Sequence, residues 1–120
     1  MTIKFTEDHE WLRIEGNLVV VGITEHASEQ LGDVVFVELP EPGSEVAKGD
    51  EICVIESVKA ASDILAPIDG EIVAINEELP DSPGLVNEDP MGAWFFKMKP
   101  ADITEIEGFM SEAAYKDFIG

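Results

Sequence analysis

The sequence contains one cysteine, two histidines and seven basic residues among 120, and these small numbers exclude several classes of protein. A single cysteine, Cys53, excludes a disulfide within the chain, and its apolar neighbours favour a small buried side chain. His9 and His26 have no cysteine at a spacing typical of zinc sites. Phosphate-binding glycine loops and Gly-x-Ser-x-Gly motifs are also absent, so we predict that the chain is not an enzyme by itself.

The basic residues are outnumbered by 26 acidic ones, which gives a formal net charge of −19 at pH 7. Binding to a polyanion requires clustered lysine and arginine, so we expect neither nucleic acids nor anionic membranes as partners. The acidity favours solubility. It also favours docking into electropositive clefts of larger proteins, with association rates that fall as the salt concentration rises.

Long apolar runs and targeting signals are missing as well. No apolar run approaches the ~20 residues that a membrane-spanning helix requires. The first eight residues lack the charged and then apolar pattern of a secretory signal. We therefore expect a bacterial-type cytoplasmic protein, or a mitochondrial matrix protein whose transit peptide has been removed. With an apolar fraction of 45%, residues 1–120 are expected to form a single domain with its own core.

Short segments rich in β-branched and aromatic residues dominate the chain. Six of them predict strands: 11–15, 18–23, 34–39, 51–56, 71–76 and 93–99. A short helix is predicted over 25–31, with Thr24 as its N-cap and Gly32 at its end. After the last strand the pattern becomes helical, and Ser111 is expected to cap a final helix that runs to Phe118.

The middle of the chain contains an internal repeat. Residues 51–56 and 71–76 are similar, and each copy follows a turn that contains glycine. Two similar β-units predict a mainly β fold, as a small pseudo-symmetric sandwich or flattened barrel. The stretch 76–90, rich in acids, proline and glycine, predicts an ordered loop or short helical turns.

The C-terminal apolar residues are expected to cover the sandwich. The predicted strand 93–99 places Trp94, Phe96 and Met98 on one face, because side chains alternate along a strand. In the helical segment that follows, apolar residues recur at helical spacing, at Ile103, Ile106, Phe109 and Met110.

Lys59 is the only basic residue between Lys48 and Lys97, and it lies between the two repeats among small side chains. One interpretation is an ordinary solvated lysine at the tip of a hairpin. The other is a covalent attachment site for an acyl cofactor, because a slim turn on a rigid sandwich makes the amine accessible to several enzymes. The resulting tether reaches on the order of 10–15 Å.

The segment 56–63, Glu-Ser-Val-Lys-Ala-Ala-Ser-Asp, resembles the lipoylation motif of the glycine cleavage system H-protein family. The resemblance continues along most of the chain, in the segments 9–11, 21–24, 30–40, 66–71 and 86–90. Each segment is weak by itself, whereas their order and spacing together are specific. The chain departs from the family at 91–94, where the family commonly has one more residue. Biotin carriers share the fold type but usually place methionine beside the lysine, and that signature is absent.

This resemblance implies a barrel-sandwich hybrid of the lipoyl and biotinyl type, with a short helix in its N-terminal half and helices at its C-terminus. It implies one carrier domain over 1–120, with the lipoyl hairpin around 51–76. It implies that Lys59 carries lipoic acid and that Glu56 is a handle for the lipoylating enzyme, although a solvated charge would also suit Glu56. In this family the loaded arm folds into a surface cleft, and the matching positions are Glu10, Ile23, Gln30 and Asp63.

H-proteins are carriers rather than catalysts, and the chemistry belongs to their cofactor. The resemblance implies that the chain accepts the aminomethyl group of glycine from a pyridoxal-phosphate decarboxylase and delivers it to a tetrahydrofolate-dependent aminomethyltransferase. Dihydrolipoamide dehydrogenase then reoxidises the arm, and a lipoate ligase or octanoyl transferase attaches it. We expect a monomer, because the carrier visits three enzymes.

Two alternatives remain open. The first is an H-like lipoate carrier that serves lipoate relay or sulfur metabolism. The second is an interaction module without lipoate, which would tolerate the substitution Lys59→Arg. The presence of Glu10, Ile23 and Asp63 favours the glycine carrier over both, since these positions match the aminomethyl cleft of the family.

Overall fold

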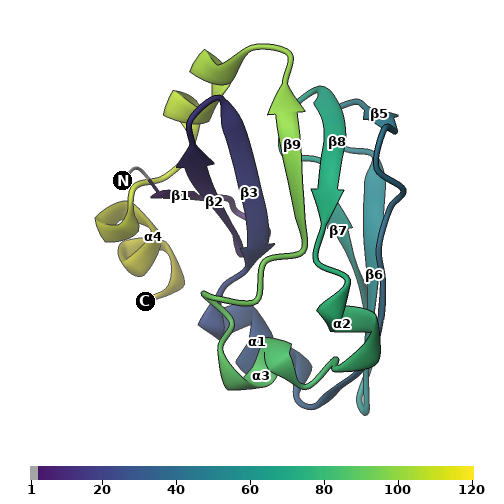
Figure 1. The fold of residues 1–120 in the computed structure, drawn as a ribbon. Coiled ribbons are helices and arrows are strands. Elements are labelled where there is room, and N and C mark those ends of the chain that lie inside the picture. The colour runs from purple at the N-terminus through teal and green to yellow at the C-terminus, as the bar shows by residue number, and fades with distance from the viewer. Residues whose placement is uncertain (1–2) are drawn as a thin grey trace.

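Nine strands and several short helices make up the computed structural model, which describes residues 3–120 (Figure 1). The strands are β1 (Ile3–Phe5), β2 (Glu10–Glu15), β3 (Leu18–Ile23), β4 (Val34–Glu38), β5 (Glu45–Val46), β6 (Glu51–Ser57), β7 (Ala61–Leu65), β8 (Gly70–Ile75) and β9 (Phe96–Pro100). The helices are α1 (Glu25–Leu31), α2 (Glu78–Asp81), α3 (Leu85–Glu88), the 3₁₀ helix η1 (Ile103–Gly108) and α4 (Glu112–Ile119). None of the helices within residues 3–120 has the length and apolar character needed to span a membrane.

The strands form two antiparallel sheets, a six-stranded sheet in the order β1-β2-β3-β9-β8-β5 and a three-stranded sheet in the order β4-β6-β7. The mainly β sandwich architecture predicted from the sequence is confirmed. The two copies of the internal repeat lie in opposite sheets, as β6 and β8. The hairpin that contains Lys59 consists of β6 and β7 and ends at Leu65. The range 51–76 therefore contains this hairpin and also β8, which belongs to the larger sheet.

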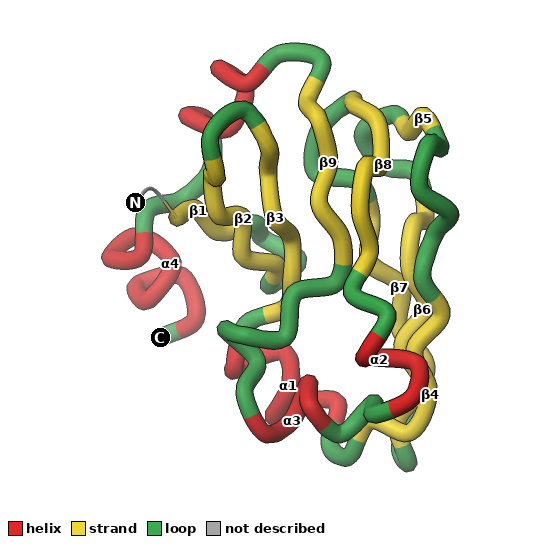
Figure 2. Tube along the Cα trace, in the orientation of Figure 1, coloured by secondary structure: helices red, strands yellow, loops and turns green. Residues whose placement is uncertain are grey.

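Three of the short helices, α1, α2 and α3, gather at one end of the sandwich, where α1 and α3 lie next to each other (Figure 2). Local capping explains why α1 begins and ends where the sequence predicts. The hydroxyl of Thr24 accepts a hydrogen bond from the backbone N–H of Ala27 at 3.2 Å. Gly32 ends the helix with a φ of 77°, and its N–H donates to the carbonyl of Ser28 at 3.1 Å. Ser111 caps α4 as predicted.

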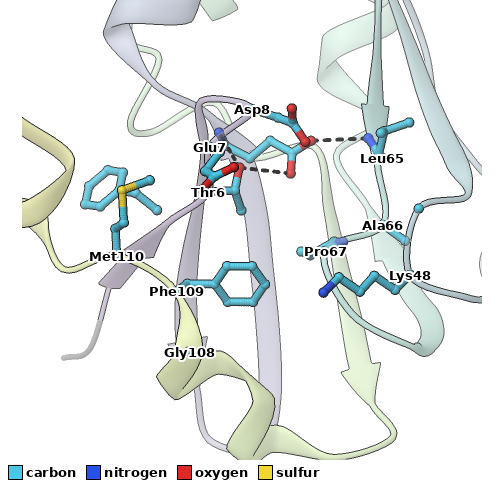
Figure 3. Close-up of a pocket in the computed structure, with 13 residues that line it drawn as sticks. Thr6, Glu7, Asp8, Lys48, Leu65, Ala66, Pro67, Gly108, Phe109 and Met110 are labelled. Carbon is cyan, nitrogen blue, oxygen red and sulfur yellow. Dashed lines mark hydrogen bonds between the residues drawn. The ribbon is translucent and has the colours of Figure 1, made fainter. Parts of the chain in front are cut away.

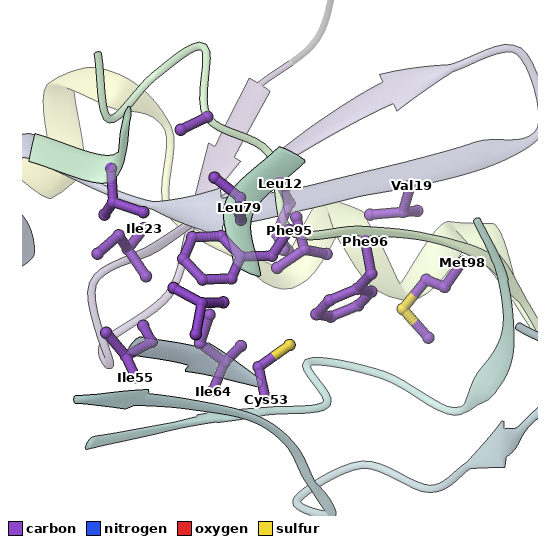
Figure 4. Packing of buried hydrophobic residues seen from close by; sticks show 14 of the residues in the cluster. Leu12, Val19, Ile23, Cys53, Ile55, Ile64, Leu79, Phe95, Phe96 and Met98 are labelled. Carbon is purple, nitrogen blue, oxygen red and sulfur yellow. The ribbon is translucent and has the colours of Figure 1, made fainter. Parts of the chain in front are cut away.

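The core lies between the two sheets (Figure 4). Fully buried side chains reach it from both sides: Leu12, Val19, Phe96 and Met98 from the larger sheet, and Val37, Cys53, Ile55 and Ile64 from the smaller one. Burial raises the pKa of the Cys53 thiol far above its usual value, so this cysteine is a small apolar core residue, as the sequence indicates.

The apolar residues after β9 cover the core only in part. Ile106 is buried in the main core, and Phe109 packs against it, as the sequence predicts. Met110 instead joins a second cluster on the outside of the larger sheet, which contains Phe5, Trp11, Val20 and Tyr115. Ile103 stays substantially exposed, so the expectation is wrong for this residue. After β9, the main core is therefore covered by Ile106 on η1 and by Phe109, which follows it, while α4 packs against the second cluster through Tyr115.

The predicted strand 93–99 is wrong at its start, because β9 begins at Phe96. Phe95 and Phe96 are consecutive residues, and both are fully buried in the main core. Alternation along a strand would place one of them on the opposite face, so the chain leaves strand geometry before Phe96. In consequence Trp94 does not share a face with Phe96 and Met98, and it packs against the second cluster.

Gly22 on β3 allows β3 to pack closely against the buried indole of Trp11. A Cβ atom at Gly22 would lie 2.5 Å from ring atoms of Trp11, whose Nε1 donates to the carbonyl of Pro90 at 3.0 Å. Because this ring is fully buried and hydrogen-bonded, Gly22→Ala is expected to lower the free energy of unfolding by about 1–3 kcal/mol. Urea denaturation measures the difference. Gly84→Ala is the control, since a Cβ there meets nothing within 4 Å, and equal midpoints for the two variants would contradict the prediction.

Candidate functional site

Lys59 lies in the tight turn 57–60 that joins β6 to β7, which we call the lysine turn. The hydroxyl of Ser57 stabilises this turn: it donates to the carbonyl of Ala60 at 3.0 Å and accepts from the N–H of Ala60 at 3.1 Å and of Lys59 at 3.3 Å. The N–H of Ser57 donates to the same carbonyl at 2.8 Å. Lys59 and its neighbours Val58 and Ala60 are exposed. The turn therefore holds its backbone by internal bonds and leaves the amine accessible.

The lysine turn is attached to the chain segment that follows α1. The N–H of Val58 donates to the carbonyl of Asp33 at 3.1 Å, and Val34 pairs with Ser57 between β4 and β6. Asn87 on α3 binds this segment from the other side. Its Oδ1 accepts from the N–H of Val34 at 2.8 Å, and its Nδ2 donates to the carbonyl of Gly32 at 2.7 Å. Sequence reasoning assigned no role to Asn87, although it lies in the family-like segment 86–90.

A cleft of about 320 Å³ lies beside the lysine turn, and Ala61 and Ser62, which follow the turn on β7, form part of its wall. All four residues predicted for the arm cleft line it: Glu10, Ile23, Gln30 and Asp63. Glu10 and Ile23 meet because they are paired across β2 and β3. The structure therefore brings these positions from β2, β3, α1 and β7 to one place.

The lining of this cleft combines an apolar base with acidic groups. Ile55 and Ile64 contribute buried apolar side chains from the smaller sheet. Asp8, Glu10 and Asp63 contribute carboxyl groups, and no lysine or arginine is among the described residues that line the cleft. Such a lining suits an aliphatic chain that ends in a cation, because the chain is desolvated at the base and the cation finds acceptors.

Glu10 is the acidic residue with the most unusual environment, since only 3% of its surface is exposed. Its Oε2 accepts from the N–H of Leu65 at 3.2 Å and its Oε1 from the hydroxyl of Thr6 at 3.4 Å. Burial raises the pKa of this carboxyl to about 8, against the opposing effect of the hydrogen bond from Leu65. The group is therefore largely neutral at pH 7.

A second cavity, of about 390 Å³, also has Glu10 in its lining, and Figure 3 shows other residues that line it. It is lined by Thr6 from the loop before β2, by Leu65 at the end of β7, and by Lys48 and Phe109. Asp8 and Glu10 therefore line both hollows.

His9 connects the cleft to the C-terminal helix. It adopts a left-handed φ of 66°, which is uncommon for a residue other than glycine. Its Nδ1 lies 2.7 Å from the hydroxyl of Tyr115 on α4, and this hydroxyl lies 2.8 Å from that of Thr24. Burial and the neighbouring His26 lower the pKa of His9, while Asp8 opposes the shift. No local signal predicts this contact, because the partners are 106 positions apart.

Glu56 does not lie in the cleft. It is exposed on β6, whereas its neighbour Ile55 is buried, so it lies on the outer face of the smaller sheet. On β4 the residue opposite is Phe36, and a bulge between Val34 and Phe36 leaves both Val35 and Phe36 exposed. Glu56 therefore lies next to an apolar surface near the lysine turn.

Comparison with known proteins identifies relatives along the whole described chain. A family model with the description Glycine cleavage H-protein matches residues 3–120. The glycine cleavage system H protein of Bartonella quintana (strain Toulouse) is 57% identical over 119 residues, which cover 98% of each chain. That of Xanthobacter autotrophicus (strain ATCC BAA-1158 / Py2) is 54% identical over 119 residues, 98% of this chain and 95% of the relative.

Solved structures give the same result. The crystal structure of a glycine cleavage system H protein from Mycobacterium marinum superposes with a TM-score of 0.86 at 37% identity, and the match covers 96% of this chain and 94% of the other. The sandwich fold, the exposed lysine turn and these full-length matches agree with one another. The chain belongs to the glycine cleavage H-protein family, whose members are the lipoyl carriers of the glycine cleavage system.

Proposed function

We propose that Lys59 carries the lipoyl group, and that the chain transports the aminomethyl group of glycine between enzymes. The observation that supports this most directly is the cleft beside the lysine turn, which is lined by Glu10, Ile23, Gln30 and Asp63. When bound, the lipoyl group supplies a dithiolane that takes up the aminomethyl group and is reoxidised after delivery. The protein contributes an exposed amine, a rigid turn and a cleft.

The proposed partners follow from this role. A pyridoxal-phosphate glycine decarboxylase loads the carrier, a tetrahydrofolate-dependent aminomethyltransferase unloads it, and dihydrolipoamide dehydrogenase reoxidises it. The relatives named above are bacterial, and we propose that the chain works in a bacterial cytoplasm as a monomer. A net charge of −19 supports brief docking into electropositive clefts, because the attraction raises association rates more than affinity.

The cleft suits a loaded arm because the ionisation of Glu10 can change with the charge that the arm carries. A buried ammonium requires a carboxylate or other acceptors. Glu10, with a pKa raised to about 8, is largely neutral at pH 7 and by itself leaves no unpaired charge in the cleft. An ammonium beside it favours its ionised form, so Glu10 releases its proton when the cation enters. Asp63, exposed on the lysine hairpin, provides a second carboxylate at the mouth of the cleft.

Glu56 is proposed as the handle for the lipoate ligase or octanoyl transferase that attaches the arm. It lies on the outer face of the smaller sheet, away from the cleft lining. Exposed Phe36 on the neighbouring strand provides an apolar contact beside this acid. An enzyme bound to this face therefore reaches Lys59 without entering the cleft.

The proposal is tested by glycine–bicarbonate carbon exchange with the pyridoxal-phosphate component. Protein that is fully lipoylated by mass is expected to support exchange, and the same chain without lipoate is expected to support none. Full lipoylation without exchange, beside an active control carrier, would favour the alternative role in lipoate relay or sulfur metabolism. Failure of a competent ligase to modify the chain would contradict the assignment of Lys59.

A further inference from the structure

Gly32, which ends α1, lies against the aliphatic stem of Lys59. A Cβ atom built on Gly32 would lie 2.9 Å from Cε of Lys59, 3.6 Å from Nζ and 3.8 Å from Cδ. The first of these distances is shorter than real Cβ contacts. The stem of the exposed Lys59 therefore lies directly against Gly32, and a Cβ atom there would push this side chain aside.

The position of Gly32 relates this space to the cleft. The residues just before it on α1, Gln30 and Leu31, both line the cleft. Ala61, just after the lysine turn, lines the same cleft from β7. Gly32 and the lysine turn are thus each followed or preceded in the sequence by residues that line the cleft.

The backbone at Gly32 is held from two sides. Asn87 accepts from the N–H of Val34 at 2.8 Å and donates to the carbonyl of Gly32 at 2.7 Å. From the opposite direction, the N–H of Val58 donates to the carbonyl of Asp33 at 3.1 Å. Because these bonds fix the segment, an added methyl group at Gly32 would displace the stem of Lys59 more readily than the backbone.

We propose that Gly32 is a positioning residue for the acylated arm. Its missing side chain gives the stem of the modified lysine a track from the lysine turn into the cleft, and Asn87 holds that track in place. This inference rests on the proposed attachment at Lys59. Gly32 also ends α1 with a positive φ, so the test must separate the effect of its empty volume from the effect of its backbone conformation.

An octanoyl group on Lys59 provides a stable acyl arm for this test, and NMR of the cleft methyl groups provides a readout that needs no activity. In the wild-type chain, octanoylation is expected to shift the methyl signals of Ile23 and Leu31. In Gly32→Ala the ratio of bound to free arm is expected to fall severalfold, because the added methyl group pushes the stem aside. Gly16→Ala is the matched control, since Gly16 also has a positive φ, of 62°, and a Cβ there meets nothing within 4 Å. Its shifts are expected to equal those of the wild type.

Asn87→Asp is a second variant that keeps the glycine. It retains an acceptor for the N–H of Val34 and loses the donor to the carbonyl of Gly32, so a smaller loss of the same methyl shifts is expected. Full wild-type shifts in both variants would overturn the proposal for Gly32, while exchange by the lipoylated wild-type chain would still support the carrier role. Equal losses in Gly16→Ala and Gly32→Ala would overturn it too, because the general loss of stability caused by an alanine at positive φ would then explain the effect.

Discussion

Replacing Lys59 with arginine is expected to abolish both lipoylation and glycine–bicarbonate exchange. A guanidinium stays protonated and offers no nucleophilic amine at neutral pH, so no amide can form. The turn itself is expected to persist, because its hydrogen bonds come from the hydroxyl of Ser57 and the backbone rather than from the lysine side chain. The variant therefore removes the reaction and leaves the charge and the fold.

Intact mass after incubation with a lipoate ligase and lipoate measures the modification, and the exchange assay measures its consequence. Lys48→Arg is the matched control, since Lys48 is the preceding lysine in the sequence and lies outside the lysine turn. This control is expected to gain the lipoyl mass and to support exchange fully. A lipoyl mass on the Lys59→Arg protein would show that another lysine is the acceptor, and exchange without modification would exclude a lipoyl carrier role.

Glu10→Gln is expected to stabilise the protein increasingly as the pH rises from about 5 to 9. In the folded wild type, burial raises the pKa of Glu10 from 4.5 to about 8. Between these two values the folded state keeps a proton that the unfolded state has released, so the free energy of unfolding falls by ~1.4 kcal/mol per pH unit. The wild type keeps all of this stability below pH 4.5 and has lost it above pH 8. The total loss is roughly 3–5 kcal/mol in the free energy of unfolding.

Glutamine removes this titration while it preserves the local hydrogen bonds. Its carbonyl accepts from the N–H of Leu65, and its amide donates to the hydroxyl of Thr6. Urea denaturation at pH 5, 7 and 9 gives the difference between variant and wild type, which is expected to grow with pH. Asp63→Asn, which removes an exposed carboxylate from the same cleft, controls for the change in net charge. A difference that does not vary with pH would show that Glu10 ionises as readily in the folded state as in the unfolded one.

Local signals explain which parts of the structure could be predicted from the sequence. Thr24 and Gly32 mark the ends of α1 because capping depends on neighbouring atoms. The exposed lysine turn follows from small residues between two β-rich runs. The start of β9 is different, because it depends on the burial of both Phe95 and Phe96, which only the packed core determines.

The cleft shows the same difference between local signals and contacts that only the folded chain determines. Its residues were identified by resemblance, since Glu10 is one of 26 acidic residues and nothing in its neighbours predicts that it is buried. Glu10 is buried where β2 meets the end of β7, and its carboxyl accepts a hydrogen bond there from the N–H of Leu65. Asn87 supports the lysine turn by accepting a hydrogen bond from the N–H of Val34, which lies 53 positions earlier in the sequence. No periodicity in the sequence indicates such a contact.

The central place of β9 in the larger sheet has a consequence for the timing of folding during synthesis. β9 is the last of the described strands to leave the ribosome, yet it lies between β3 and β8 and pairs with both. Until Phe96 to Pro100 emerge, β3 and β8 have no strand between them. The core also lacks the buried side chains of Phe96 and Met98 until then. The β6–β7 hairpin, whose partners are close in sequence, can form earlier. A nascent chain can therefore present its lysine turn before its core has closed.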